Sequence, residues 1–128
     1  MLDTNPIRSL MIPVNTPPYV LEDTFDVLKR FSFYNLPTHT ISFSDEYSII
    51  VSHFYDKSYR YSNFFATTLL RSLHIDLQQN NYILYGPAMF VGTDHHGQHV
   101  SVPMKILDPM LNLMSRYSDE NAQELSRF

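Results

Sequence analysis

All three glycines of this 128-residue chain, Gly86, Gly92 and Gly97, fall in one short segment that also contains Pro87. Glycine is the residue that most easily adopts a positive φ or allows another segment to approach the backbone closely. A chain that uses glycine nowhere else concentrates its unusual backbone geometry in one place. We therefore expect these four residues to have structural roles in turns or tight packing.

The apolar periodicity of the rest of the chain predicts an α+β fold. Helical spacing predicts three helices, over residues 24–31, 63–73 and 103–117. Runs of β-branched and aromatic residues predict strands over 9–14, 19–21, 38–43, 47–54, 82–91 and 100–102. This order predicts a largely antiparallel sheet with the helices on one face. Its length predicts a single domain, 1–128, and its polar residues 118–128 predict a frayed tail.

Each predicted helix carries a more specific expectation. The first has an apolar stripe of Phe25, Leu28 and Phe31. Ser62 or Asn63 can cap the second, and we assign the cap to Asn63. The third has a stripe, rich in methionine, that should pack on the sheet or on a second copy of the chain. A stripe left partly open favours a homodimer, and the alternative is a monomer whose own core uses the whole stripe. Its members are Ile106, Leu107, Met110, Leu111 and Met114.

Composition excludes several classes of protein. The chain has no cysteine, which rules out disulfides and thiolate metal sites. Its nine Lys and Arg residues are scattered and its net charge is −4, so direct binding to nucleic acid is not expected. No apolar run approaches the roughly 20 residues of a membrane span, and no signal peptide is visible. We therefore expect a cytoplasmic protein that does not bind membranes.

The segment Asp94–His99 is the main cluster of metal-ligand residue types. Asp94, His95 and His99 would be the ligands if the chain were a metal- or small-ligand-binding module or a hydrolase. The neighbouring His95 and His96 point apart in an extended chain, and the spacing matches no established metal site. No nucleophile motif or phosphate-binding glycine loop is present. We therefore expect no metal, no cofactor and no catalysis.

A second polar segment, residues 55–61, mixes four aromatic or acidic side chains with two cations. Such a mixture can stack on nucleic-acid bases or contact a protein, and the acidic character of the chain favours protein. We predict partner-binding residues in this segment and in the histidine segment, both of which should be exposed loops. These residues are Tyr55, Asp56, Tyr59, Arg60, Tyr61, Asp94, His95 and His96.

Four short motifs occur in a recognisable order: Leu10-Met11-Ile12-Pro13, Asp45-Glu46, Asn63-Phe64-Phe65-Ala66-Thr67, and Gly86-Pro87 to Gly92 followed by Asp94. Over residues 8–105 the chain resembles a family of small uncharacterised proteins, a domain of unknown function found mainly in bacteriophages and other mobile elements. It departs from the family pattern at Tyr47, where a turn glycine is usual, and at Ser62, where proline is frequent. The family offers no catalytic residues to carry over. The resemblance implies a phage or mobile-element origin and an accessory role.

Together these features predict a non-enzymatic protein that binds and modulates a host protein, by inhibiting, for example, a nuclease of a defence system. The alternative is the metal- or small-ligand-binding module centred on Asp94–His99.

Overall fold

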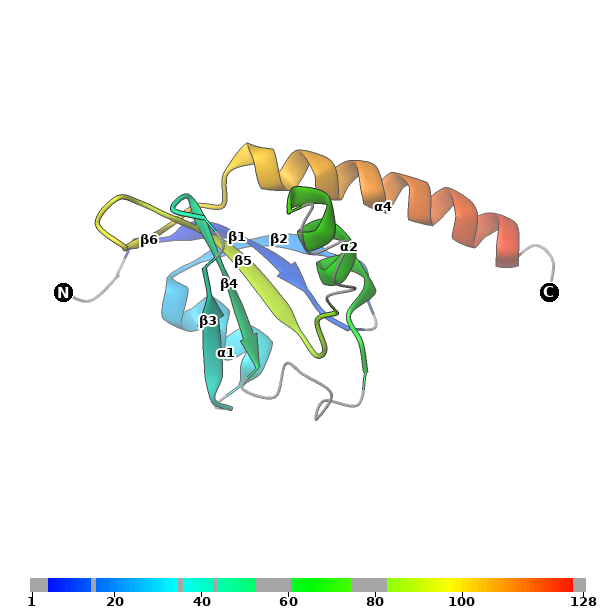
Figure 1. The fold of residues 1–128 in the computed structure, drawn as a ribbon. Helices are drawn as coiled ribbons and strands as arrows, with labels where there is room; N and C mark the ends of the chain where they lie inside the picture. The colour runs from blue at the N-terminus through cyan, green and yellow to red at the C-terminus, as the bar shows by residue number, and fades with distance from the viewer. Residues whose placement is uncertain are drawn as a thin grey trace.

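The computed structural model describes residues 5–14, 16–34, 36–42, 44–52, 61–74 and 83–125. Their elements are β1 (Ile7–Ile12), β2 (Tyr19–Asp23), α1 (Phe25–Phe33), β3 (Thr38–Ile41), β4 (Tyr47–Ser52), α2 (Phe64–Leu73), β5 (Ala88–Thr93), β6 (His99–Val100) and α4 (Met104–Leu125). The strands form one antiparallel sheet of six, in the order β2-β1-β5-β4-β3, with β6 beside β5 (Figure 1). The predicted α+β fold with a largely antiparallel sheet is confirmed.

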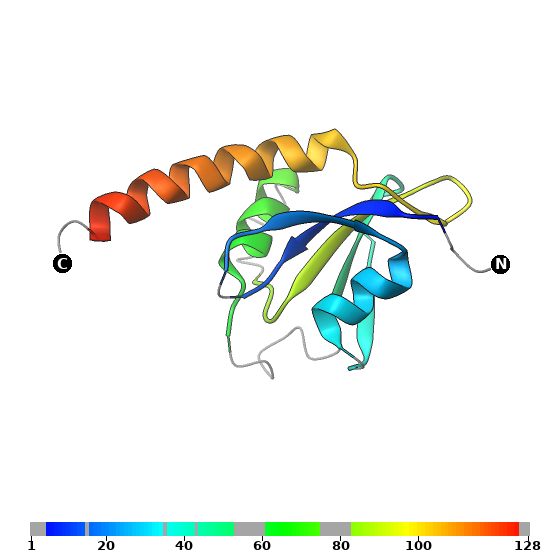
Figure 2. The same ribbon diagram turned by 180° about the vertical axis from the view of Figure 1, so that it is seen from behind.

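The helices cover both faces of the sheet, which corrects the prediction that they share one face (Figures 1 and 2). On β5, Ala88 and Phe90 belong to the core under α2 and α4, whereas Met89 and Val91 belong to the core under α1. Because both faces are covered, β4 is buried along its whole length. Apolar periodicity identifies the residues that a helix buries, but it does not determine which face of the sheet the helix crosses.

The ends of several elements differ from the predicted bounds. α1 continues to Phe33, which is buried, whereas Phe31 is 59% exposed and does not belong to the inner stripe. β5 begins only after Pro87, since proline has no N–H to donate to a strand ladder. Before it, Tyr85 forms an isolated bridge with Ser62.

α4 is the longest described helix and runs past the edge of the sheet (Figure 1). It continues to Leu125, whereas residues 118–128 were predicted to be a frayed tail. The glutamates, alanine, glutamine and leucine of this segment are good helix formers, and polarity alone did not indicate disorder. Within the described part of the chain, no helix has both the length and the apolar character to span a bilayer.

β1 and β6 share the same long side of β5. Leu10 and Ile12 of β1 pair with the first half of β5, and Val100 of β6 pairs with Gly92 in the second half. β1 therefore separates from β5 at Arg8, whose carbonyl accepts the N–H of Val102 at 2.8 Å. The segment that follows β6 therefore lies between β1 and β5 where these two strands separate.

Candidate functional site

Asn63, the predicted helix cap, is completely buried. Its Oδ1 accepts the backbone N–H of Ala66 at 3.1 Å, so the predicted cap of α2 is present. Its Nδ2 donates to the carbonyl of Ile12 at 2.9 Å and to that of Gly86 at 2.8 Å. One side chain therefore joins the start of α2 to the end of β1 and to the segment that leads into β5.

Thr67, the last residue of the Asn63–Thr67 motif, makes a second link of this kind. Its Oγ1 accepts the N–H of Leu84 at 2.9 Å, while the backbone N–H of Asn63 donates to the carbonyl of Leu84 at 2.7 Å. The polar groups of the motif are thus used inside the fold. This motif has a structural function and is not a ligand-binding site.

The glycines serve backbone geometry. Gly86 has a φ of 81° and Gly97 a φ of 78°, a region that residues with a Cβ rarely adopt. Gly92 lies where β6 crosses closely, and a Cβ there would be 2.3 Å from the carbonyl oxygen of Ser101. Pro87 follows Gly86 directly and ends the irregular segment before β5.

Asp94 holds the turn between β5 and β6. Its backbone carbonyl accepts the N–H of Gly97 at 3.0 Å. Its carboxylate Oδ1 accepts the N–H groups of His96 and Gln98, each at 2.9 Å. The hydrogen bond from Gln98, followed by that from His96, lowers the pKa of Asp94, because both favour the charged carboxylate. The carboxylate is therefore committed to the turn.

The histidines of this turn do not gather around a common point with Asp94. The ring of His99 stacks on Phe25 of α1, with ring centroids 3.8 Å apart. The rings of His95 and His96 lie 4.0 Å apart on exposed positions of the turn. Among the described residues, no group of three or more His, Cys, Asp or Glu side chains could hold a metal ion. The alternative ligand set of Asp94, His95 and His99 is therefore not assembled.

Of the predicted partner-binding residues, the structure describes Tyr61, Asp94, His95 and His96. Tyr55, Asp56, Tyr59 and Arg60 lie outside the described residues. Tyr61 is 49% exposed, and its carbonyl accepts the N–H of Gly86 just before β5. Asp94, His95 and His96 follow the other end of β5, a strand of six residues. The length of an extended strand, about 3.3 Å per residue, therefore separates the two groups.

A tyrosine–histidine pair had no signal in the sequence. The hydroxyl of Tyr47, at the start of β4, hydrogen-bonds Nε2 of His74, the C-cap of α2. Burial raises the pKa of Tyr47 to about 12, so its hydroxyl keeps its proton at neutral pH. The pair ties α2 to the sheet across 27 positions of sequence, a separation that no local pattern reveals.

Four exposed apolar residues of β2 and the first turns of α4, with the partly buried Leu107, form what we call the β2–α4 surface: Tyr19, Val20, Met104, Leu107 and Leu111. They surround an apolar pocket of about 130 Å³ whose floor includes Leu10 and Met110. Val20 is 46% exposed and Leu111 is 56% exposed. The predicted stripe of α4 is thus divided, since Ile106 and Met110 are buried in the core while Leu111 remains at the surface.

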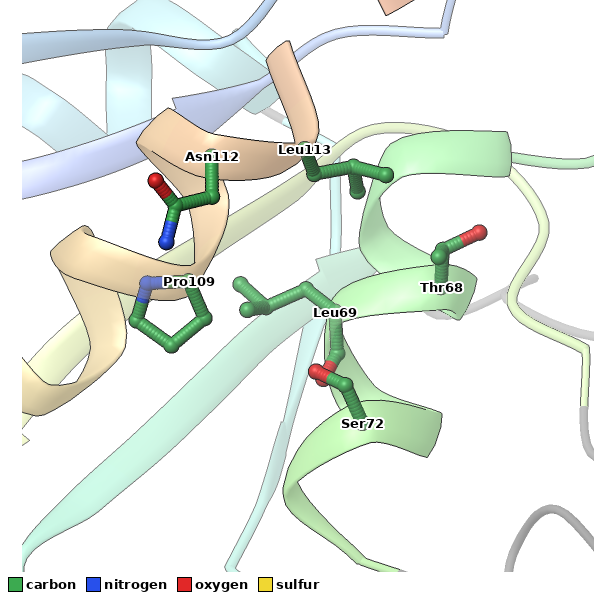
Figure 3. A pocket seen from close by; sticks show the side chains of 6 residues that line it. All are labelled: Thr68, Leu69, Ser72, Pro109, Asn112 and Leu113. Atoms are coloured by element: carbon green, nitrogen blue, oxygen red, sulfur yellow. The ribbon is translucent and has the colours of Figure 1, made fainter. Parts of the chain in front are cut away.

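A second pocket, of about 320 Å³, lies between α2 and α4 (Figure 3). Leu69 and Leu113 supply apolar walls, Pro109 supplies a third, and the hydroxyls of Thr68 and Ser72 and the amide of Asn112 supply polar edges. The Ser72 hydroxyl already donates to the carbonyl of Leu69 at 2.7 Å. The residues that line this groove are all neutral, so it offers no charged group to hold an ion.

Comparison of the chain with protein-family models, curated proteins and solved structures finds no match.

Proposed function

We propose that this chain is a protein-binding accessory protein of a phage or mobile element, and that it acts without catalysis in the host cytoplasm. In this proposal it inhibits a host protein, such as a nuclease of a defence system. The resemblance of residues 8–105 to a phage family supports the origin. The observation that supports a role in protein–protein contact, here with a second copy of the chain, is the β2–α4 surface, because an exposed apolar patch on a small domain marks a contact site.

A second copy of the chain is the occupant that we assign to the β2–α4 surface. β2 is an edge strand of the sheet, and an edge strand can pair with its own copy about a two-fold axis. In an antiparallel pairing of the β2 strands of two copies, the two Leu21 residues would face each other. Each Val20 would then lie opposite a Glu22 of the other copy, and each Tyr19 opposite an Asp23. No two carboxylates would face each other directly, so this register avoids like-charge repulsion.

The surfaces away from this edge are then left for the host protein. His95 and His96 are exposed in the β5–β6 turn, and Tyr61 is exposed at the other end of β5. These side chains remain predicted contacts, together with Tyr55, Asp56, Tyr59 and Arg60. A dimer would present each of these contacts twice and would raise the apparent affinity for a partner that is itself multimeric.

Affinity capture from a lysate of the bacterial host tests the proposal. We expect one host protein to be recovered in a fixed stoichiometry to the chain, and its purified form to lose activity when the chain is added. A chain in which His95, His96 and Tyr61 are replaced by serine should recover less of it. Recovery of no stoichiometric protein, or a recovered protein whose activity is unaffected, would contradict the proposal.

A further inference from the structure

The outer face of α1 carries two exposed apolar residues, Val27 and Phe31, beside the exposed charges of Asp26 and Arg30, although its inner face already packs on the sheet. Leu28 and Phe33 are buried on the inner side. Val27 and Phe31 are four residues apart, which places them on one side of the helix, and they are 40% and 59% exposed. Tyr34, the C-cap that follows the helix, is 77% exposed. A helix with apolar residues on both sides is normally covered on both sides. This face is therefore suited to contact with another molecule.

Tyr34 ends α1 with a backbone conformation that favours glycine. Its φ is 55° and its ψ is −125°, and the N–H of Leu36 donates to the carbonyl of Phe33 at 3.0 Å across it. These angles match the first central residue of a type II′ turn, a position where glycine is strongly preferred. The Tyr34 ring is mostly exposed, so burial of the ring does not offset the strain. Strain kept at an exposed aromatic residue indicates a functional role.

The charge beside Tyr34 differs in sign from that of the whole chain. Lys29 and Arg30 are the one pair of adjacent cations in a sequence whose net charge is −4. With Tyr34 and Leu36 they line a pocket of about 310 Å³, in which Asp26 is the one carboxylate. An acidic ligand would be repelled by most of the surface and attracted here.

We propose that the outer face of α1 and this adjoining pocket bind an acidic segment of a partner protein. Its apolar side chains would pack on Val27, Phe31 and Tyr34, and its carboxylates would pair with Arg30 and Lys29. Tyr34 is the anchor, since exposed aromatic residues beside arginine dominate the energetics of protein interfaces. The site rests on the proposed protein-binding function, but it does not depend on the β2–α4 dimer.

The continuity of α1 with the β5–β6 turn supports this location. His99, at the end of the turn, stacks on Phe25 at the start of α1, and the Lys29 ammonium lies 5.6 Å from the centre of the same ring. The turn that carries the exposed His95 and His96 therefore lies beside the first residue of α1, at the opposite end of the helix from Tyr34. A partner segment bound along α1 could extend onto the turn.

A labelled peptide, Glu-Glu-Leu-Phe-Glu-Glu, is a direct probe of the site, with Lys-Lys-Leu-Phe-Lys-Lys as its charge-inverted control. We expect the acidic peptide to bind the intact chain and the basic peptide to bind more weakly. The net negative charge of the protein alone would favour the opposite order. Tyr34→Gly should weaken binding by about tenfold or more while raising Tm, because glycine relieves the strained backbone. Arg30→Glu should weaken binding of the acidic peptide. Tyr19→Ser, an exposed tyrosine on β2, should leave it unchanged.

Three results would contradict the proposal that this face of α1 binds an acidic segment. The first is equal or tighter binding of the basic peptide, or no binding of either peptide. The second is a Tyr34→Gly variant that binds normally or that loses stability. The third is self-association that Tyr34→Gly abolishes, which would assign this face to a second copy. A host protein still captured stoichiometrically in any of these cases would leave the proposed function standing, so the two failures are distinguishable.

Discussion

The side-chain amide nitrogen of Asn63 lies 2.9 Å from the carbonyl oxygen of Ile12, across 51 positions of sequence. The hydrogen bond links the first turn of α2 to the last residue of β1. Because Asn63 is completely buried, water cannot replace this bond if the amide is removed. The side chain of Asn63 therefore contributes to holding α2 in its position on the sheet, together with Thr67 and Tyr47.

Asn63→Ala should destabilise the domain by about 2–5 kcal/mol, because it removes the cap and leaves the carbonyls of Ile12 and Gly86 buried without this donor. Asn63→Ser keeps a capping oxygen but has no amide to donate, so it should lie between the wild type and the alanine variant. Urea unfolding monitored by circular dichroism measures all three. Equal stability of the serine variant and the wild type would show that the two carbonyl bonds contribute nothing.

The glycines Gly92 and Gly97 should respond differently to alanine. Gly92→Ala places a methyl group 2.3 Å from the Ser101 carbonyl oxygen, which is backbone and cannot rotate away. We expect a loss of about 3 kcal/mol or more, or a chain that does not fold. Gly97→Ala meets no atom within 4 Å and suffers only the strain of its positive φ, so about 1–2 kcal/mol is expected. Thermal unfolding of both variants tests the contrast, which a similar Tm for the two would contradict.

The sequence predicted the features that depend on local chemistry. The two strands β3 and β4 followed from two runs of β-branched and aromatic residues, and the Asn63 cap followed from a polar residue before a helical stripe. Glycine composition correctly placed the unusual backbone at Gly86 and Gly97. Each of these signals is contained within a few residues, which is why it could be recognised without the fold.

The features that were missed depend on contacts between distant segments. Phe31 and Phe33 are equally apolar, and only the path of α1 across the sheet decides that Phe33 is buried. The positive φ of Tyr34 has no sequence signal, since tyrosine is an unusual residue for it. The Tyr47–His74 pair and the β2–α4 surface join residues far apart in the chain.

Tyr47 should make stability depend on pH in the alkaline range. The pKa of about 12 in the folded protein lies above the value of about 10 for an unfolded tyrosine. The stabilisation that the protonated Tyr47 hydroxyl contributes to the folded state is therefore complete below pH about 10 and is lost as the pH rises through about 12. The Tyr47→Phe variant has no phenol group to ionise. The difference between its free energy of unfolding and that of the wild type should therefore shrink by about 1 kcal/mol between pH about 8 and about 11. A deficit that stays constant over this interval would contradict the raised pKa.

The β2–α4 surface predicts the oligomeric state. Light scattering at micromolar concentration should give twice the 15.0 kDa mass of one chain. Leu111→Asp places a charge at a half-exposed position of this surface, which the monomer tolerates because the side chain can reach water. In the dimer the same carboxylate would be buried without a partner, so the Kd should rise by about thirtyfold or more.

Phe31→Asp is the matched control, because Phe31 is as exposed as Leu111 but lies on α1 at the opposite face of the sheet. It should leave the dimer intact. A 15.0 kDa species in the wild type would exclude the dimer at that concentration. A dimer that survives Leu111→Asp and Val20→Lys but dissociates with Phe31→Asp would move the interface to α1 and would assign that face to a second copy instead of an acidic segment.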